Sequence, residues 1–193
     1  DLHIPPAHQS EVLVLLPCSA TKPYRLSQSH HRFLKNISSN RVHQVMVTSP
    51  LGLVPRELED LWPAAHYDIP VTGDWDVDEL DMINSMVTDI CRRSNYAYVI
   101  NHSGIELSIG SAIVKDTRLG TAGSKESLSE LSISVSEAVG KLNLQDVSEK
   151  KNRIELMKSR SRFIHGTDDW LDGADVSGRL PILSISKNDE QLA

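Results

Sequence analysis

The sequence predicts an α/β domain built around a mostly parallel sheet. Three short runs of aliphatic and β-branched residues have the pattern of buried strands, and each is followed by proline or polar residues. Stretches with apolar residues at helical spacing separate these runs along the chain. Strands that alternate with helices favour parallel pairing, so the order of the elements predicts this fold class.

The predicted strands cover residues 11–16, 43–48 and 97–101. The first, EVLVLL, is almost wholly apolar and stops at Pro17, so we expect a parallel strand covered on both faces of the sheet. The second, HQVMVT, stops at Ser49-Pro50 and has the same character. All three are therefore expected in the interior of one sheet.

The predicted helices cover residues 28–37, 77–91 and about 127–141. Apolar residues recur every three or four positions in each of them, as on the inner face of an amphipathic helix. The second has a marked start, because Asp76 and Glu79 are spaced as a capping box. Cys91 falls on the apolar stripe of that helix, and we expect it to be an inert core thiol.

We expect three parts along the chain. They are a core domain over residues 1–145, a linker helix over 146–166, and the start of a further module over 167–193. The last part is rich in Asp and Gly and then alternates as strands do. It is too short to bury a core of its own, which predicts an incomplete β-rich module.

Composition restricts the functional classes. The net charge of -6 argues against autonomous binding of nucleic acid, although it is compatible with RNA brought in by another domain or subunit. The predicted linker helix is basic, a pattern that is also typical of a solvated face. No run approaches the roughly 20 apolar residues of a membrane span. Two cysteines are too few for a disulfide framework, so a reducing cytoplasm is expected.

The segment after the first strand holds the candidate catalytic residues Cys18, Lys22, Tyr24, Ser27 and His30. Ligands of open α/β sheets bind at the carboxyl ends of strands, where this segment begins. A helix start and Lys22 both favour a thiolate at Cys18, and His30 has the side chain of an acid or base. The alternative is that Cys18 is a small buried hydrophobe and Ser27 only a helix cap.

Polar residues elsewhere are candidates for substrate binding. The set is Pro17, Ser49, Arg56, Glu57, His66, Asp68, Asn101 and His102. Several follow predicted strands, although an Arg-Glu pair at a helix start is often structural, and His66 has the spacing to bond to Asp68. No histidine or cysteine pairing has zinc-type spacing, and no glycine pattern cradles a phosphate or dinucleotide. The sequence therefore predicts neither a metal nor a cofactor.

Residues 17–30 contain the pattern P-C-x3-K-P-Y-x2-S-x2-H. This pattern resembles the hallmark of archaeosine synthase, the archaeal paralogue of tRNA-guanine transglycosylase, at all seven fixed positions. Residues 47–59 and 63–75 also resemble the core domain of that family. Residues 171–193 resemble the family's segment leading toward an RNA-binding PUA domain.

The resemblance implies a three-layer α/β/α fold similar to uracil-DNA glycosylase. It also implies a reaction at the nitrile of 7-cyano-7-deazaguanine in the tRNA D-loop, to which an amine from lysine or glutamine is added. Cys18 would attack the nitrile to form a thioimidate or line the pocket, and His30 or Lys22 would supply a proton. Tyr24 would stack on the base or orient it. A separate tRNA-binding subunit or the PUA domain would hold the tRNA.

Two other functions are compatible with the sequence. One is a non-catalytic module of a transglycosylase-related protein that binds tRNA or a partner. The other is glycosylase-like removal of a base, which follows from the fold alone. The first loop offers no Asp or Glu to activate a water, which argues against the glycosylase. The intact motif favours the enzyme over the binding module.

Overall fold

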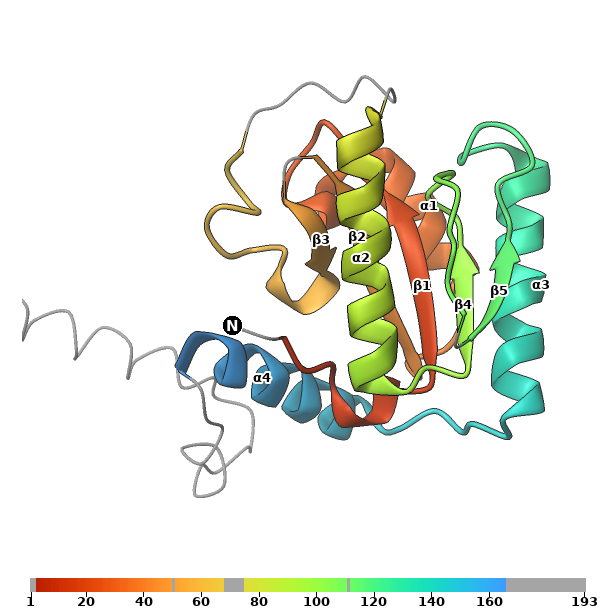
Figure 1. Cartoon of the computed structure of the whole chain (residues 1–193). Coiled ribbons are helices and arrows are strands. Elements are labelled where there is room, and N and C mark those ends of the chain that lie inside the picture. The colour runs from red at the N-terminus through yellow and green to blue at the C-terminus, as the bar shows by residue number, and fades with distance from the viewer. Residues whose placement is uncertain (1–2, 50, 68–74, 111, 166–193) are drawn as a thin grey trace, which may run out of the picture.

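The computed structural model describes residues 3–49, 51–67, 75–110 and 112–165. A sheet of five strands, in the order β3-β2-β1-β4-β5, lies at the centre of the domain (Figure 1). The strands are β1 (Val12–Pro17), β2 (Val42–Thr48), β3 (Gly52–Pro55), β4 (Tyr98–Asn101) and β5 (Ile113–Asp116). Only β3 runs antiparallel to its neighbour, which confirms the predicted mostly parallel sheet.

The central strand β1 is buried on both faces. Val12, Val14 and Leu16 belong to one apolar cluster, and Leu13 and Leu15 belong to the other. This alternation follows from the two-residue period of a strand, which points successive side chains to opposite faces. The continuous apolar run seen in the sequence therefore serves two separate layers of core.

Helices cover the two faces. They are α1 (Gln28–Asn36), α2 (Val77–Ser94), α3 (Lys125–Lys141) and α4 (Glu149–His165). Helices α1 and α3 contact each other and pack on one face, and α2 covers the other face (Figure 1). The domain is therefore a three-layer α/β/α arrangement. The described residues also form the short 3-10 helices η1 (Ala7–Gln9), η2 (Tyr24–Leu26) and η3 (Arg56–Leu58).

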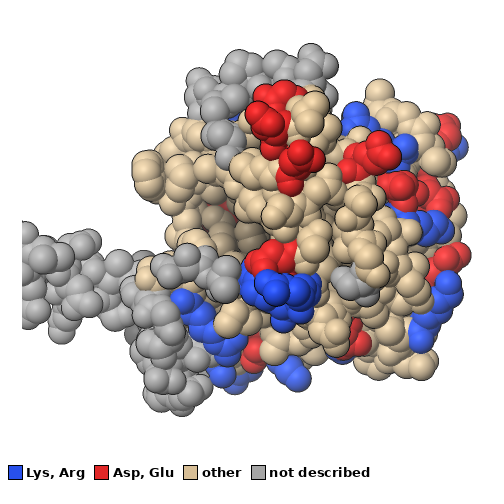
Figure 2. Space-filling model, in the orientation of Figure 1, with Lys and Arg blue, Asp and Glu red and all other residues tan. Residues whose placement is uncertain are grey.

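The start of α2 is built as predicted. The Asp76 carboxylate accepts a hydrogen bond from the Glu79 backbone N–H at 2.8 Å, and Glu79 accepts one from the Asp76 N–H at 3.2 Å. Acidic residues occupy the first turn and basic residues the last, which suits the helix dipole. Figure 2 shows this segregation, with acidic side chains over the upper end of α2 and basic ones over its lower end.

Strands β3 and β5 are not predicted by the sequence pattern. β3 has only four residues, begins at Gly52 with a positive φ of 73° and ends at a proline, so no strand pattern develops. β5 is an edge strand whose four residues are exposed or half-buried. Both strands form because β2 and β4 offer free edges for pairing.

Helix α4 corresponds to the predicted linker and packs against η1 and η3 at the base of the core. His8 Nε2 lies 2.8 Å from the Asn152 side-chain oxygen, and the Ser159 hydroxyl donates to the Ile4 carbonyl at 2.6 Å. The predicted β-rich module lies outside the described residues. None of the helices in the described part of the chain has the length and apolar character required to span a membrane.

Candidate active site

The Cys18 segment lies where β1 and β2 end. Cys18 follows Pro17, the last residue of β1, and Thr48 is the last residue of the neighbouring β2. Pro17 is in register with Val47, which brings Thr48 beside Cys18. Cys18 is half-buried, and Thr48 lies close enough to lower the pKa of its thiol. A thiol and a hydroxyl thus share the rim at which open α/β sheets bind ligands.

Three hydroxyl groups bond to one another beside this thiol. The phenol oxygens of Tyr24 and Tyr67 form a hydrogen bond, and the Tyr67 hydroxyl also bonds to Thr48 Oγ1. The Thr48 hydroxyl lies 3.2 Å from the Ser49 carbonyl as well. Because a hydroxyl both donates and accepts, this group can reorient its hydrogens around a polar ligand.

Lys22 brings a positive charge to the same rim. Its ammonium nitrogen lies 3.9 Å from the centroid of the Tyr67 ring, which is a cation–π contact. Burial raises the pKa of the Cys18 thiol above its ordinary value, while the Lys22 charge and the Thr48 hydrogen bond oppose this rise. In the free protein Cys18 is therefore a neutral thiol beside a cation at neutral pH.

His30 lies behind this rim with both ring nitrogens engaged. Its Nε2–H donates to the Pro17 carbonyl at 3.0 Å, and its Nδ1 accepts from the Arg56 guanidinium at 2.9 Å. The residue is fully buried. Burial, reinforced by the Arg56 charge, lowers the pKa of His30 to about 3. This neutral ring does not fit the predicted acid or base role, and instead it anchors the backbone directly before Cys18.

Ser27 and Tyr24 also differ from the roles expected of them. The Ser27 hydroxyl accepts from the His30 backbone N–H at 3.2 Å and caps α1, so the structure matches the alternative in which Ser27 is a cap. Tyr24 is fully buried, and its ring offers no face on which a base could stack. Its hydroxyl alone reaches the Cys18 rim, through Tyr67.

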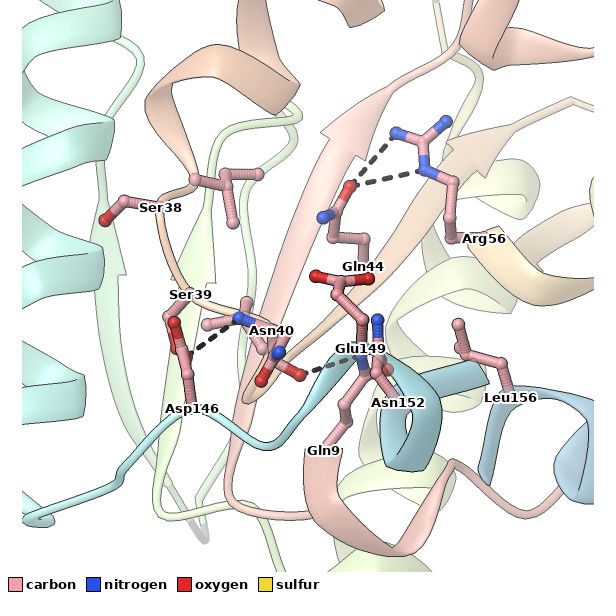
Figure 3. Close-up of a pocket in the computed structure, with 12 residues that line it drawn as sticks. Gln9, Ser38, Ser39, Asn40, Gln44, Arg56, Asp146, Glu149, Asn152 and Leu156 are labelled. Carbon is pink, nitrogen blue, oxygen red and sulfur yellow. Dashed lines mark hydrogen bonds between the residues drawn. The ribbon is translucent and has the colours of Figure 1, made fainter. Parts of the chain in front are cut away.

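Arg56 does not reach this rim. It donates to Gln44 at 3.2 Å and to Glu59 at 3.0 Å in addition to His30. Together with Gln44 it borders a cavity of ≈ 350 Å³ between β2, the loop before it and α4 (Figure 3). Asn40 and Asp146 lie at the far side of that cavity. Arg56 therefore connects the cavity to His30, whereas the Cys18 cluster lies outside it.

Glu57 points to the base of the domain. Its carboxylate lies 2.8 Å from His3 Nε2 and 3.3 Å from His43 Nε2, and its side chain is 2% exposed. Burial alone would raise the pKa of Glu57, but His43 and His3 outweigh it and hold the pKa below its usual range. The structure thus places Glu57 with two histidines, a set that could hold a metal ion, rather than at the predicted substrate rim.

Asn101 and His102 lie at the carboxyl end of β4 as predicted, but their polar groups are hydrogen-bonded within the protein. Asn101 Nδ2 donates to the Ile105 carbonyl at 2.8 Å, and its oxygen accepts from the Ser103 hydroxyl at 2.6 Å. The two His102 nitrogens lie 2.8 Å from Thr117 Oγ1 and 2.9 Å from the Ala122 carbonyl. Both residues are buried, so they shape the turns after β4 and offer nothing to a ligand.

The remaining candidates are dispersed. The Ser49 hydroxyl donates to the Glu79 carboxylate and joins the end of β2 to α2. Pro17 contributes only its carbonyl, which accepts from His30. His66 is exposed in the loop before Tyr67, and Asp68 lies outside the described residues.

Thr48 and Tyr67 are the site residues that sequence reasoning missed. Thr48 is the last residue of a predicted strand, and its position alone is a signal because it neighbours the end of the first strand in a parallel sheet. Tyr67 comes from a loop, and no periodic pattern predicts that it meets Tyr24. Its position follows from tertiary packing of the chain after η3.

Comparison with known proteins identifies the family. A family model described as a domain of unknown function, DUF5591, matches residues 3–135. This chain belongs to the DUF5591 family. The DUF5591 chain is 35% identical to the archaeosine synthase subunit alpha of Methanosarcina acetivorans, over 95% of its own length and 32% of that relative. It is also 35% identical to the archaeosine synthase of Methanocaldococcus jannaschii, over 81% and 28% of the two chains.

These matches confirm the resemblance inferred from the sequence motif. The DUF5591 chain spans about a third of the length of these two curated relatives. A shorter match to the archaeosine synthase of Haloferax volcanii is 49% identical over 90 residues. The crystal structure of AF0587, a protein of unknown function, has a TM-score of 0.56 and 21% identity over 81% of this chain and 52% of that one. That similarity supports the α/β fold.

Proposed function

We propose that this chain is the catalytic domain of an archaeosine-forming enzyme, which adds an amine to the nitrile of 7-cyano-7-deazaguanine in tRNA. The observation that carries the proposal is the half-buried thiol of Cys18, which lies beside Thr48 and Lys22 at the rim where β1 and β2 end. It gains weight from the 35% identity, over 95% of the chain, to a protein named archaeosine synthase subunit alpha.

The chemistry of a nitrile fits this set of groups. In the covalent route, the Cys18 sulfur bonds to the nitrile carbon and the thiol proton ends on the nitrile nitrogen, giving a thioimidate. The amine then bonds to the same carbon, the C–S bond breaks, and an amine proton returns to sulfur. The product is an amidine, and the sequence of steps needs no other reactant. Direct attack by the amine, with Cys18 lining the pocket, is the competing route.

The surrounding groups would have distinct tasks. Lys22 favours the thiolate and supplies a positive charge near the nitrogen anion that develops on the nitrile. The hydroxyls of Thr48 and Tyr67 are available to orient the base or the amine. His30 acts through the Pro17 carbonyl and is a positioning residue. We therefore assign to Lys22, rather than to His30, the transfer of the thiol proton to the nitrile nitrogen.

The partners follow from the proposed reaction. They are tRNA that carries the nitrile base and an amine donor, either lysine or glutamine. The name subunit alpha, given to the Methanosarcina relative, implies at least one further subunit in that protein. For this chain we propose that a separate subunit or a PUA domain holds the tRNA, and that the reaction occurs in the cytoplasm, where Cys18 stays reduced.

Mass spectrometry of the protein incubated with nitrile-bearing tRNA and each amine tests this function. We expect consumption of the nitrile, loss of that activity in Cys18→Ala, and, before amine is added, an adduct on Cys18 equal to the mass of the substrate. Cys91→Ala is the matched control, because Cys91 is buried among apolar residues and burial raises its pKa to about 11. Undiminished turnover in Cys18→Ala would remove the thiol from the reaction.

A binding module is the second candidate, and the charge of α4 favours it. Lys150, Lys151 and Arg153 are exposed on this helix, which is attached to the base of the domain. Such residues suit contact with the phosphates of tRNA. If the chain and its partner bound nitrile-bearing tRNA without consuming it under any amine, the binding module would be the correct function.

A further inference from the structure

Three side chains from distant segments converge at the end of β2 opposite Thr48. His3 comes from the arm before η1, His43 from the second position of β2, and Glu57 from η3. One donor atom of each lies within 4.8 Å of the other two. His3 is 9% exposed, His43 is fully buried, and the Glu57 side chain is 2% exposed.

We propose that His3, His43 and Glu57 bind a divalent transition metal with the ligand preference of zinc. Two imidazole nitrogens and one carboxylate are a donor set that zinc takes in proteins, with a fourth position left for another ligand. The Ser159 hydroxyl lies 3.2 Å from His3 Nε2 and 3.3 Å from Glu57 Oε1, so it or a water completes the set. The proposal is independent of the reaction at Cys18.

An unpartnered polar atom supplies the second observation. Within the described part of the chain, Glu57 Oε2 is buried and has no hydrogen-bond partner. By contrast, Glu57 Oε1 is within bonding distance of both histidines and of Ser159. Without a metal, all three partners of the Glu57 carboxylate therefore bond to Oε1, and Oε2 has none. A cation shared by both oxygens removes that imbalance.

The surroundings of His43 are those of a metal ligand. Its Nδ1 lies 2.5 Å from the Tyr96 hydroxyl, which leaves Nε2 directed at Glu57. Histidines that bind metals usually use their second nitrogen in this way, because the outer bond fixes the ring orientation. The rings of His3 and His43 stack with centroids 5.5 Å apart and an angle of 13° between their planes, so both reach the same carboxylate.

The spacing is close to that of a tetrahedral zinc site. Bonds of about 2.0–2.1 Å place neighbouring ligand atoms roughly 3.3 Å apart. The separation of His43 Nε2 and Glu57 Oε1 is 3.3 Å, whereas that of His3 Nε2 and Glu57 Oε1 is 2.8 Å. Of these two separations only that of His3 must lengthen, and the two histidine nitrogens lie within 4.8 Å of each other. His3 precedes the first helix of the chain.

The proposed metal would be structural. It joins the N-terminal arm, β2 and η3 at the base of the domain, next to α4, and lies at the opposite end of β2 from the Cys18 rim. No sequence pattern predicts this site, because its ligands are 40 and 14 residues apart, whereas zinc-type spacing is short.

The test is metal binding by the untagged 193-residue chain, stripped with chelator and titrated with zinc or cobalt(II). We expect one equivalent per chain, visible absorption from tetrahedral cobalt, and a higher melting temperature with zinc. Loss of the hydrogen-bond partner of a metal-binding histidine lowers metal affinity about 10–100-fold, so Tyr96→Phe should fall in that range. The metal affinity of Glu57→Gln and of His3→Gln should fall more than about a hundredfold, because each change removes a ligand.

The controls separate this site from other metal-binding groups. His8→Gln removes a neighbouring buried histidine that bonds to Asn152, and Cys18→Ser removes the rim thiol; both should bind metal as the wild type does. If Glu57→Gln does not fold, His3→Gln at the start of the chain still decides the matter. A folded wild type that binds no stoichiometric metal, or a His3→Gln protein that binds it equally well, would overturn the proposal.

Discussion

The carboxyl ends of β1 and β4 lie in the same sheet, but their polar side chains differ in exposure and in hydrogen bonding. Beyond β1, Cys18 is half-buried and shares its rim with Thr48, Tyr67 and Lys22. Beyond β4, every polar atom of the His102 ring has a partner, and the residue is fully buried. Both ends are polar in sequence, but only the first keeps reactive groups that a ligand can reach.

The difference teaches that position at a strand end does not by itself make a site. The end of β4 is followed directly by turns whose backbone must be satisfied, and Asn101 and His102 supply those bonds. At the end of β1, the Pro17 carbonyl is instead bonded by His30, which lies further along the chain. Cys18 is thereby left free for a ligand.

The largest contrast is expected in activity. Cys18→Ala should lower nitrile consumption more than about a thousandfold, equivalent to ~4 kcal/mol, if the covalent route operates. Its free energy of unfolding should change by less than about 1 kcal/mol, because a half-buried thiol contributes little packing. Steady-state assays and guanidinium denaturation of the same preparation measure both values. If the variant lost as much free energy of unfolding as transition-state stabilisation, Cys18 would be a structural residue, as His102 is at the end of β4.

The opposite pattern is expected at His102. His102→Leu removes the ring partner of the half-buried Ala122 carbonyl and of the buried Thr117 hydroxyl, which keeps only its 3.3 Å bond to the Asn101 carbonyl. We expect the free energy of unfolding to fall by about 3 kcal/mol, at roughly 1–3 kcal/mol per unsatisfied group. His31→Leu, an exposed neighbour on α1, is the control and should change stability by less than about 0.5 kcal/mol. Unchanged stability in His102→Leu would mean that the end of β4 is available for binding.

The fold could be predicted from sequence where burial is strong and periodic. β1, β2 and the capping box of α2 have local signals that tertiary structure only reinforces. β3 and β5 have no such signal, because an edge strand depends on the partner that it joins. Helix α4 was predicted as an element, but its packing on η1 and η3 is a long-range property.

The site could be predicted in part for the same reason. Cys18 and Lys22 are four residues apart in sequence, and the structure keeps them together. Residue type does not reveal whether a histidine is exposed, so His30 and His102 resemble catalytic residues until their partners are known. Likewise, Glu57 follows Arg56 directly, yet the two side chains serve different clusters.

Lowering the pH should test the buried support of the Cys18 rim, which His30 provides. The pKa of His30 is about 3 in the folded chain and near 6.5 when unfolded, so the unfolded state binds more protons between these values. Stability is therefore lost as pH falls below about 6.5, and His30 alone should cost about 2 kcal/mol between pH 7 and pH 5. His30→Gln keeps one donor for the Pro17 carbonyl and one acceptor for Arg56, and without a titratable ring it should remove that loss. His8 and His102, whose pKa values are also lowered, remain in both proteins.

Denaturation curves at the two pH values give the difference directly. His31→Gln changes an exposed histidine of the same helix and serves as the control. If His30→Gln and the wild type lost the same stability between pH 7 and pH 5, His30 would not be the buried neutral group described above, and its assignment as a positioning residue would fail.

The smallest expected effect concerns the charge of Lys22 beside the Cys18 thiol. Lys22 lowers the pKa of Cys18, so Lys22→Met should raise that pKa further and shift the rate of Cys18 alkylation by iodoacetamide to higher pH. A rise of one unit reduces the thiolate at neutral pH about tenfold. Lys22→Arg retains the charge and should leave the profile near that of the wild type. An unchanged profile in Lys22→Met would show that Lys22 does not tune the thiol, and its remaining task would be to hold the Tyr67 ring or to contact substrate directly.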